Sequence, residues 1–235
     1  LTPFDRAVHN VIATLWEIWH RDKKRDNEYL TPRIIFQVLS GNTEEDKSIS
    51  SVMRKDILAS IDKMGATKIT IDNSAEAKAF GYKKFKYFGS LLYIKRIEGV
   101  KINGNEVVDC IQVIQSPALY EYAKRKKQII SVDIKMLNIP RFSNTSENIE
   151  LKEYLLRRIM AIKNPKSRIN ETIKYQTIYE YLRIEANTRA TLLVKYKRIR
   201  SKVKKILEFW KSEKFIVDYK EEKEGKLITK ITITC

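Results

Sequence analysis

Residues 195–205 have the sequence Lys-Tyr-Lys-Arg-Ile-Arg-Ser-Lys-Val-Lys-Lys, with seven basic residues and no acidic one. Through and around this run, apolar residues recur every three or four positions, which predicts one buried stripe along a helix. The stripe consists of Leu192, Tyr196, Ile199, Val203, Ile206 and Trp210. Cations cover the rest of this helix, and like charges four residues apart destabilise a helix unless a partner neutralises them. The pattern indicates a helix that lies against nucleic-acid phosphates; a merely solvated basic helix is the alternative.

The charge of the whole chain also favours a polyanionic partner. Its 235 residues include 46 basic and 29 acidic ones, for a formal net charge of +17. Residues 1–140 hold 23 basic and 17 acidic residues, a net charge of +6, whereas residues 141–235 hold 23 and 12, a net charge of +11. The shorter C-terminal part is therefore the more strongly charged.

Cysteine content and hydropathy argue against several other classes of protein. Cys110 and Cys235 are the two cysteines, too few for a disulfide framework or a zinc site, so we expect no metal and no cofactor. Free thiols fit a reducing cytosol, which predicts a cytoplasmic location. No stretch approaches the roughly 18–20 apolar residues of a membrane span, and the apolar seam of the basic helix is narrow, so we expect no membrane partner.

Hydrophobic periodicity predicts the same order of elements twice, with a linker at 138–146 between the copies. In the first copy the predicted helices are 2–19, 31–40, 50–64 and 117–127. The predicted strands there are 67–72, 91–98, 106–115 and 128–132, with a hairpin turn at Asn103-Gly104. In the second copy the predicted helices are 147–162, 175–182 and 189–211. The predicted strands are 215–219 and 227–234, around a charged turn at 221–226.

Three helices and a β-hairpin describe a winged helix, a variant of the helix-turn-helix whose third helix enters the major groove. The sequence therefore predicts an α+β chain of two tandem winged-helix domains joined by a short linker and helix. The N-terminal domain would span 1–140, contacting DNA and supporting dimerisation, and the C-terminal domain 144–235 would be the main DNA-contacting unit. A generic α+β protein in which helices and hairpins happen to recur is the alternative.

Four stretches, in this order, carry a resemblance that covers nearly the whole chain. They are Leu1-Thr-Pro-Phe-Asp-Arg-Ala-Val-His9, Ser60-Ile-Asp-Lys-Met64, Glu153-Tyr-Leu-Leu-Arg-Arg-Ile159 and Lys197-Arg-Ile-Arg-Ser-Lys-Val-Lys-Lys-Ile-Leu207. Together they resemble the replication initiator (Rep) proteins of bacterial plasmids and related mobile elements, which have two tandem winged-helix domains.

The resemblance implies more than the spacing does. Proteins of this family bind directly repeated double-stranded origin sites, called iterons, promote origin opening, and recruit the host's replication initiator and replicative helicase. Their N-terminal domains often form a homodimer that represses the protein's own gene. Their C-terminal domains usually make the stronger base contacts, which agrees with the uneven charge of this chain.

The exposed surface of the basic helix supplies most of the candidate DNA-binding residues. We expect base contacts from Arg189, Lys195, Arg198 and Lys202, which lie toward one flank of the apolar seam. Phosphate contacts are expected from Lys197, Arg200, Lys204 and Lys205, and Ser201 shares their surface. Periodicity alone does not separate the two roles, and a solvated charge is the alternative for each residue.

Three other segments offer candidates. Ser50, Ser51, Arg54 and Lys55 begin the third helix of the N-terminal copy, although a helix cap explains the serines equally well. Lys220, Lys223, Lys226 and Lys230 lie among glutamates in the last hairpin, as a DNA contact or a solubilising turn. Lys83, Lys84 and Lys86 lie among Phe85, Tyr87 and Phe88, and this group would stack on bases or contact phosphates unless the aromatic residues belong to the core.

Catalysis is not expected. His9 and His20 are too far apart for the close histidine pair of a rolling-circle nuclease, and His9 is expected on a helix surface. No GxxxxGK[ST] phosphate-binding loop occurs. Two rivals to the initiator remain: a transcriptional repressor that binds palindromic operators as a dimer, and an RNA-binding module with little sequence preference.

Overall fold

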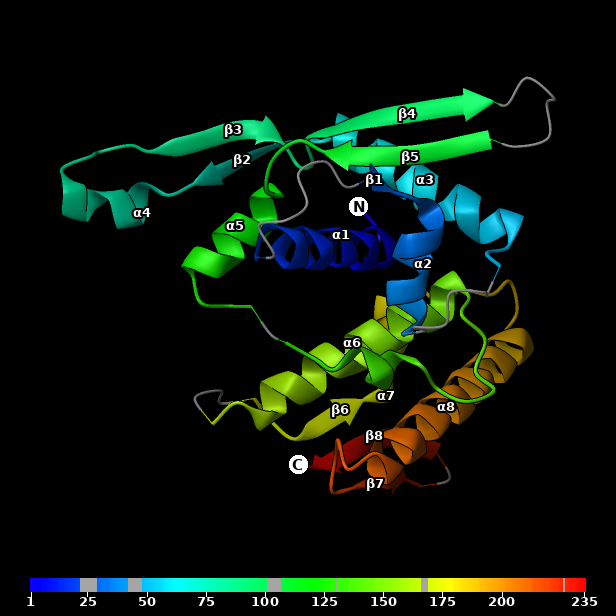
Figure 1. The fold of residues 1–235 in the computed structure, drawn as a ribbon. Coiled ribbons are helices and arrows are strands. Elements are labelled where there is room, and N and C mark those ends of the chain that lie inside the picture. Colours follow the sequence, from blue (N-terminus) through cyan, green and yellow to red (C-terminus); the bar gives the residue numbers. More distant parts are fainter. Residues whose placement is uncertain (22–28, 42–47, 101–106, 130, 166–168, 226) are drawn as a thin grey trace. The chain divides into compact units, whose positions relative to one another are not determined.

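Helices and small antiparallel sheets alternate along the chain, which is an α+β protein (Figure 1). The computed structural model describes residues 1–235 apart from 22–28, 42–47, 101–106, 130, 166–168 and 226. Its contacts define two compact units. Unit 1 comprises Leu1–Val38 and Glu44–Ile129, and unit 2 comprises Leu39–Thr43 and Ile130–Cys235. The division between the units falls just ahead of Ile130, before the predicted linker at 138–146.

Unit 1 is built from helices around a three-stranded sheet. Its elements include α1 (Pro3–Arg21), β1 (Tyr29–Leu30), α2 (Pro32–Ser40), α3 (Ser51–Ala66), β4 (Ile94–Val100), β5 (Val107–Val113) and α5 (Ala118–Arg125). The sheet has the antiparallel order β1-β5-β4. Apolar residues of α1, α2 and α3 are buried, among them Val8, Ile12, Ile35 and Ile57. The predicted turn at Asn103-Gly104 lies outside the described residues.

An insertion between α3 and β4 forms a separate two-stranded ribbon, which we call the arm (residues 68–90). It contains β2 (Lys68–Asp72), α4 (Ser74–Ala77), the 3₁₀ turn η1 (Lys78–Phe80) and β3 (Lys86–Ser90). β2 and β3 pair in an antiparallel register that sets Thr70 opposite Phe88. Figure 1 shows the arm extending away from β4 and β5 within unit 1. Periodicity predicted β2 but not β3, because the sequence from 81 to 88 is dominated by lysines and aromatics without a clean alternation.

Unit 2 repeats the order of unit 1 without the arm. After η2 (Ile134–Leu137) come α6 (Ser146–Lys163), β6 (Thr172–Lys174), α7 (Tyr175–Tyr181), α8 (Arg189–Ser212), β7 (Asp218–Glu224) and β8 (Leu227–Thr234). The sheet order β6-β8-β7 corresponds to β1-β5-β4 of unit 1. α8 of unit 2 therefore occupies the place in the chain that α3 has in unit 1.

Hydroxyl side chains cap the N-termini of four of the main helices. Thr2 and Asp5 cap α1 reciprocally, since each side chain accepts a hydrogen bond from the other's backbone N–H at 3.1 and 2.6 Å. Ser50, Thr145 and Thr188 are the N-caps of α3, α6 and α8. Each cap satisfies one of the orphan N–H groups of its helix and fixes where the helix starts.

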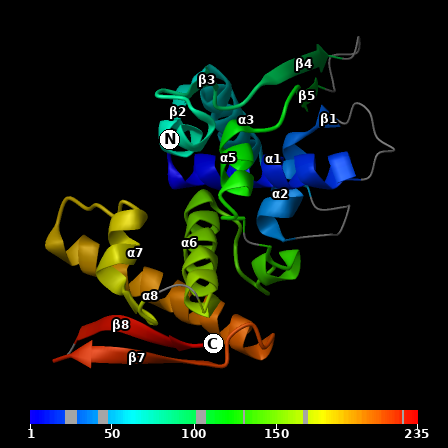
Figure 2. The same cartoon turned by 90° about the vertical axis from the view of Figure 1, so that its left-hand side faces the viewer.

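The core of unit 2 forms where the apolar stripe of α8 meets α6, α7 and the sheet. Ile199, Val203, Ile206 and Trp210 are fully buried in one cluster with residues of those elements. Figure 2 shows the β7–β8 hairpin alongside α8, and Ile231 and Ile233 of β8 belong to the same cluster. The Trp210 Nε1–H donates to the Met136 carbonyl at 2.8 Å, which ties η2 to the helix. Burying this stripe fixes which face of α8 remains outside.

Some expectations about local structure were wrong. The described residues of the predicted strand 128–132 form no strand, and the predicted strand 215–219 is displaced to Asp218–Glu224. The charged residues expected in a turn lie within β7, where Glu222 pairs with Lys230 across the sheet and Glu221 accepts a hydrogen bond from Tyr175 of α7. The turn itself is at Gly225, whose φ of +62° favours glycine. His9 is buried in unit 1, not at the surface, and burial lowers its pKa.

Candidate nucleic-acid interface

The face of α8 opposite its buried stripe is open to solvent. Because side chains three and four apart share a face, exposed residues from Ala190 to Lys211 lie together there. We call the part of this row that precedes Glu208 the outer face of α8; it comprises Ala190, Leu193, Val194, Lys197, Ser201 and Lys204. Glu208 and Lys211 continue the row and contact the hairpin, where Glu208 accepts from the Tyr219 hydroxyl at 2.6 Å and Lys211 donates to Asp218 at 2.8 Å. The outer face combines two cations and a hydroxyl with apolar side chains at its N-terminal end. Cations and hydroxyls suit phosphates and base edges, and small apolar groups suit the methyl group of thymine.

Arg198 and Lys202, two of the expected base contacts, turn toward α6 within unit 2. The Glu147 carboxylate in the first turn of α6 accepts hydrogen bonds from Arg198 Nη2 at 2.9 and 3.2 Å. Lys202 Nζ donates to the same carboxylate, and its side chain is only 21% exposed. The two cations are thus partly neutralised inside the unit. Exposed ion pairs contribute little, about 0–1 kcal/mol, so a phosphate could compete for Arg198 more readily than for Lys202.

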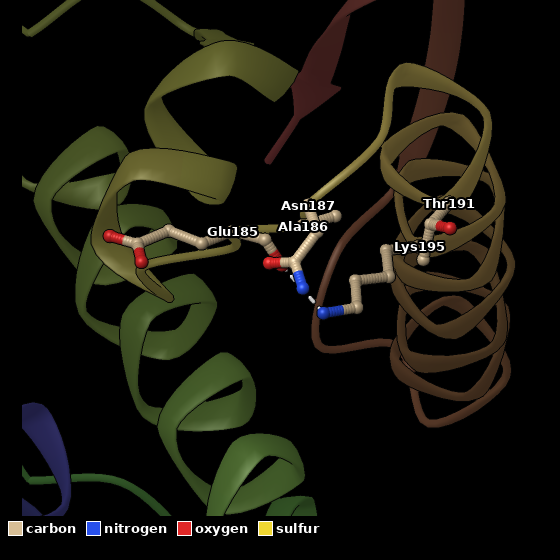
Figure 3. A pocket seen from close by; sticks show the side chains of 5 residues that line it. All are labelled: Glu185, Ala186, Asn187, Thr191 and Lys195. Atoms are coloured by element: carbon tan, nitrogen blue, oxygen red, sulfur yellow. Dashed lines mark hydrogen bonds between the residues drawn. The ribbon is translucent and has the colours of Figure 1, made fainter.

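Lys195 and Lys205 also contact their own unit. Lys195 Nζ donates to the Glu185 carbonyl, 2.5 Å away, across a small hollow lined by Glu185, Ala186, Asn187, Thr191 and Lys195. Figure 3 shows the Lys195 side chain leaving α8 toward the loop at 185–187. Lys205 Nζ donates to the Arg141 carbonyl and lies 5.9 Å from the centre of the Phe142 ring. These lysines hold the loops on either side of α8.

The two remaining arginines lie at different depths. Arg189 is the first residue of α8 and is exposed, while Arg200 is half-buried. The charge of Arg200 acts on Tyr179 of α7: burial raises the pKa of that phenol to about 12, and the nearby guanidinium opposes the rise. Arg189 therefore extends the outer face at its N-terminal end, and Arg200 lies against the body of unit 2.

Leu193 and Val194 were not predicted as part of the surface. Their side chains are 51% and 68% exposed, which is unusual for two adjacent large aliphatic residues on a packed helix. The predicted stripe was enough to find them, since at about 100° per residue positions 193 and 194 lie on the side of the helix opposite Ile199 and Ile206. The sequence analysis selected candidate contact residues by charge and hydroxyl groups, and this criterion excludes Leu193 and Val194.

In unit 1 the corresponding helix, α3, offers a weaker surface. Ser50 caps the helix, with its Oγ accepting from the Met53 N–H at 3.2 Å. Arg54 faces the sheet, with Nη2 4.0 Å from the nearly buried Asp109 carboxylate. Ser51 and Lys55 are exposed beside Val52, which is 66% exposed. The four predicted residues thus separate, and two of them share an exposed face.

The β7–β8 hairpin mixes both charges. Lys220 and Lys223 are exposed, whereas Lys230 pairs with Glu222 at 3.0 Å. The Tyr175 hydroxyl donates to Glu221 at 2.7 Å. Two of the glutamates therefore serve the sheet, and two of the lysines remain available at its surface. Lys226 lies outside the described residues.

Within the described part of the chain, no group of three or more His, Cys, Asp or Glu residues is placed to hold a metal ion. None of the helices described is long and apolar enough to cross a bilayer. Cys110 is buried and Cys235 is exposed, both as free thiols.

Comparison with known proteins gives one informative match. No protein-family model matches the chain, and no curated protein matches it in sequence. A crystal structure of selenomethionine derivatives of domains 2 and 3 of RctB is similar, with a TM-score of 0.50 at 12% identity. The alignment covers 100% of this chain and 83% of that one. At such low identity the likeness concerns the fold.

Proposed function

We propose that both units are winged helices and that the chain is a sequence-specific double-stranded DNA-binding replication initiator. Unit 2 would insert the outer face of α8 into the major groove, with the β7–β8 hairpin as its wing beside the backbone. Unit 1 would use α3 and its own hairpin more weakly. The repeated order of helices with a third strand in each sheet supports this reading of the fold.

The outer face of α8 is the observation that carries the proposal. Lys197, Ser201 and Lys204 would contact base edges or phosphates, and Leu193 with Val194 would meet thymine methyl groups. Arg189, Lys195, Arg198, Arg200, Lys202 and Lys205 would act around this centre as flanking phosphate contacts. The proposal thus moves base contact from the flank facing α6 to the outer face, because Glu147 already binds Arg198 and Lys202.

The initiator is favoured over a dimeric repressor by two considerations. RctB is a replication initiator, and its domains 2 and 3 resemble the whole of this chain in fold. In addition, α3 and α8 differ so much in charge that one chain presents two unlike contacts to DNA. Unlike contacts fit an asymmetric site, which can recur as direct repeats (iterons). A repressor that binds palindromes as a dimer is the second candidate.

Further parts of the proposal concern the steps after DNA binding. The chain would act without catalysis, opening the origin through binding energy and DNA deformation. The host initiator and the replicative helicase would be its protein partners, a homodimer through unit 1 its resting form, and the cytoplasm its location. These steps involve no membrane, metal or cofactor.

Selection of bound duplexes from a random DNA library at near-physiological salt tests the proposal. We expect enrichment of one asymmetric site spanning about two helical turns and bound by a single chain. Enrichment of palindromes would favour the dimeric repressor. Absence of enrichment, or tighter binding to double-stranded RNA, would reject sequence-specific DNA binding.

A further inference from the structure

The arm of unit 1 carries an unusual concentration of exposed aromatic side chains. Five aromatic residues are prominently exposed among those that the structure describes, and four of these lie in the arm. They are Phe80, Tyr82, Phe85 and Phe88, with exposed fractions of 80%, 55%, 45% and 69%. Exposed aromatic side chains concentrated in one projecting ribbon are typical of an interaction surface.

The scaffold beneath these rings is ordered by its own hydrogen bonds. The Phe85 carbonyl accepts from the Asn73 N–H at 2.9 Å, and the Phe85 N–H donates to Ser74 Oγ at 2.9 Å. The Tyr82 N–H donates a hydrogen bond to the Ala77 carbonyl at 3.1 Å. Tyr82 and Phe85 pack edge to face, with ring centres 5.7 Å apart. The backbone at Tyr82 and Phe85 is therefore held in place, and these two rings support each other.

The β2–β3 ribbon separates a covered face from an open one. Directly opposed residues share a face, and faces alternate along each strand. Phe88 and Thr70 lie on the open face together with the Lys86–Asp72 ion pair. Ile69, Ile71 and Tyr87 lie on the other face, where they are half-buried. Phe88 thus stands on the open face by the strand register, and not because of a local irregularity.

Cations alternate with these rings. The arm holds five lysines and two acidic residues, and Lys78, Lys83 and Lys84 are all exposed. Its acidic residues have partners: Asp72 pairs with Lys86 at 3.1 Å, and Glu76 pairs with Lys126 of α5. The surface around the rings therefore carries net positive charge.

We propose that the arm binds single-stranded DNA, with unpaired bases stacked on Phe85, Phe88 and Phe80 and the phosphates beside Lys78, Lys83 and Lys84. Flat apolar rings interleaved with cations match the two halves of a nucleotide, and this combination binds single strands with little sequence preference. Bases in an intact duplex are already stacked and offer no free faces. A second copy of the arm would bring the same lysines and so repel the first.

This binding site goes beyond the duplex contact proposed for α8 and depends on different residues. Only the choice of DNA over RNA rests on the proposed function, because an initiator that opens a duplex produces single strands next to its own site. An arm with these properties would hold one of the separated strands and so favour the open state.

The test measures fluorescence anisotropy of a labelled oligothymidylate of about 20 nucleotides with the whole chain. Replacing both rings, Phe85→Ala with Phe88→Ala, is expected to weaken binding at least about tenfold. Tyr29→Ala is the matched control, since Tyr29 is an equally exposed aromatic of unit 1 outside the arm, at 45%. We expect it to change the affinity less than about twofold. Duplex binding by the arm variant should stay unchanged, which also shows that it is folded.

Two further variants separate stacking from other modes. Phe88→Leu keeps the apolar bulk but removes the ring, so it should lose nearly as much affinity as Phe88→Ala. Lys83→Gln with Lys84→Gln should reduce the slope of log affinity against log salt by about 0.7 per lost phosphate contact.

Several results would overturn the inference. The first is the absence of measurable oligothymidylate binding. The second is a Phe88→Leu variant that binds oligothymidylate as tightly as the wild type. The third is binding of oligouridylate at least as tight as that of oligothymidylate. Arm variants that change sedimentation but not oligonucleotide binding would assign the arm to a second copy of the chain. Arm-dependent binding to vesicles with one part phosphatidylglycerol in three would assign it to a lipid surface. Loss of duplex binding through α8 with intact oligothymidylate binding would instead count against the proposed function alone.

Discussion

α3 and α8 occupy the same place in two units of the same topology, yet they carry different charge. α3 has three basic and two acidic residues over 16 positions. α8 has nine basic residues and one acidic residue over 24. Both helices bury an apolar stripe with similar spacing, so the fold needs only that stripe. The charge on the remaining surface of each helix is free to vary. Because α8 carries the higher positive charge, we infer that unit 2 makes the stronger DNA contact.

The units also differ in the sign of the charged groups that they bury, with Asp5 and Asp109 in unit 1 and Lys152 in unit 2. In unit 1, Asp5 is 2% exposed and accepts hydrogen bonds from Ser60 Oγ at 2.6 Å and Lys63 Nζ at 2.9 Å, linking α1 to α3. In unit 2, Lys152 of α6 is fully buried and donates to the Leu137 carbonyl and to Asn144 Oδ1 at 2.7 and 2.9 Å. One unit thus depends on a buried anion and the other on a buried cation.

The largest difference between the units is expected in DNA affinity. Lys197→Glu on the outer face of α8 should weaken binding to a selected duplex at least about tenfold, because it replaces a phosphate attraction by a repulsion. The matched change in unit 1, Lys55→Glu on exposed α3, should cost less than about threefold. Both affinities would be measured by fluorescence anisotropy at one salt concentration. Equal losses of DNA affinity in the two variants would contradict the proposal that unit 2 makes the stronger DNA contact.

A second pair of variants sharpens this comparison within α8. Lys197→Ala with Lys204→Ala should reduce affinity more than Arg198→Ala with Lys202→Ala, since Glu147 already partly neutralises the latter pair. A larger loss of affinity for Arg198→Ala with Lys202→Ala would show that the flank of α8 facing α6 makes the base contacts.

Asp5→Asn should destabilise unit 1 by about 1–3 kcal/mol, because the buried hydrogen bonds lose their charged acceptor. Burial raises the pKa of Asp5, but hydrogen bonds from Lys63, Ser60 and Thr2 outweigh it, so the folded pKa is lowered. The ionised carboxylate therefore contributes stability above about pH 4, and this is lost as pH falls further. Hydrogen exchange resolved by peptide should show faster exchange in α1 and α3 and no change in α6 and α8. Equal acceleration in both units would show that they unfold together.

Lys152 should make the stability of unit 2 rise with pH as well, but in an alkaline range instead of the acidic range of Asp5. Burial lowers the pKa of Lys152 to about 8 from the ordinary value of 10.5. Between these values the unfolded chain binds more protons than the folded one, so stability rises with pH by up to about 1.4 kcal/mol per unit. Denaturant unfolding at pH 7.5 and 9.5 should show this rise for the wild type. Lys152→Met should lack it, and a variant with the same rise would place the titration elsewhere.

The smallest expected effect concerns thymine recognition by α8. If Val194 covers a thymine methyl group, replacing that thymine by uracil should cost the wild type about 0.8 kcal/mol, or roughly fourfold in affinity. The Val194→Ala variant should be nearly indifferent to the same replacement. A double-mutant cycle with no coupling at any thymine of the site would show that the exposed aliphatic residues do not contact bases.

The sequence predicted those elements whose side chains repeat with a clear period. The stripe from Leu192 to Trp210 located α8 and its buried face, and the serine at position 50 indicated the start of α3. Short elements such as β1 and β6 were missed because two or three residues contain no period. β3 was missed because lysines and aromatic residues at 81–88 do not alternate cleanly, and because Phe88 faces solvent where a strand usually has a polar residue.

For the candidate site, composition located the helix but could not orient the side chains on it. Periodicity placed Arg198 and Lys202 on the surface, which is correct, but their partner Glu147 is 51 and 55 residues away in sequence. Such contacts depend on how α6 packs against α8. The exposed positions of Leu193 and Val194 depended only on the local helix, and the sequence contained enough information to find them.

Cross-linking from matched positions tests most directly whether α8 is the DNA-contacting helix. In a chain whose exposed Cys235 is replaced by Ser, a photoactivatable group would be attached at Ser201→Cys on the outer face of α8, or at Ser51→Cys on α3. We expect position 201 to cross-link efficiently to bases inside one selected duplex site, and position 51 to react weakly. Cross-linking from position 51 that equals or exceeds that from position 201 would contradict the assignment of α8 as the main DNA-contacting helix.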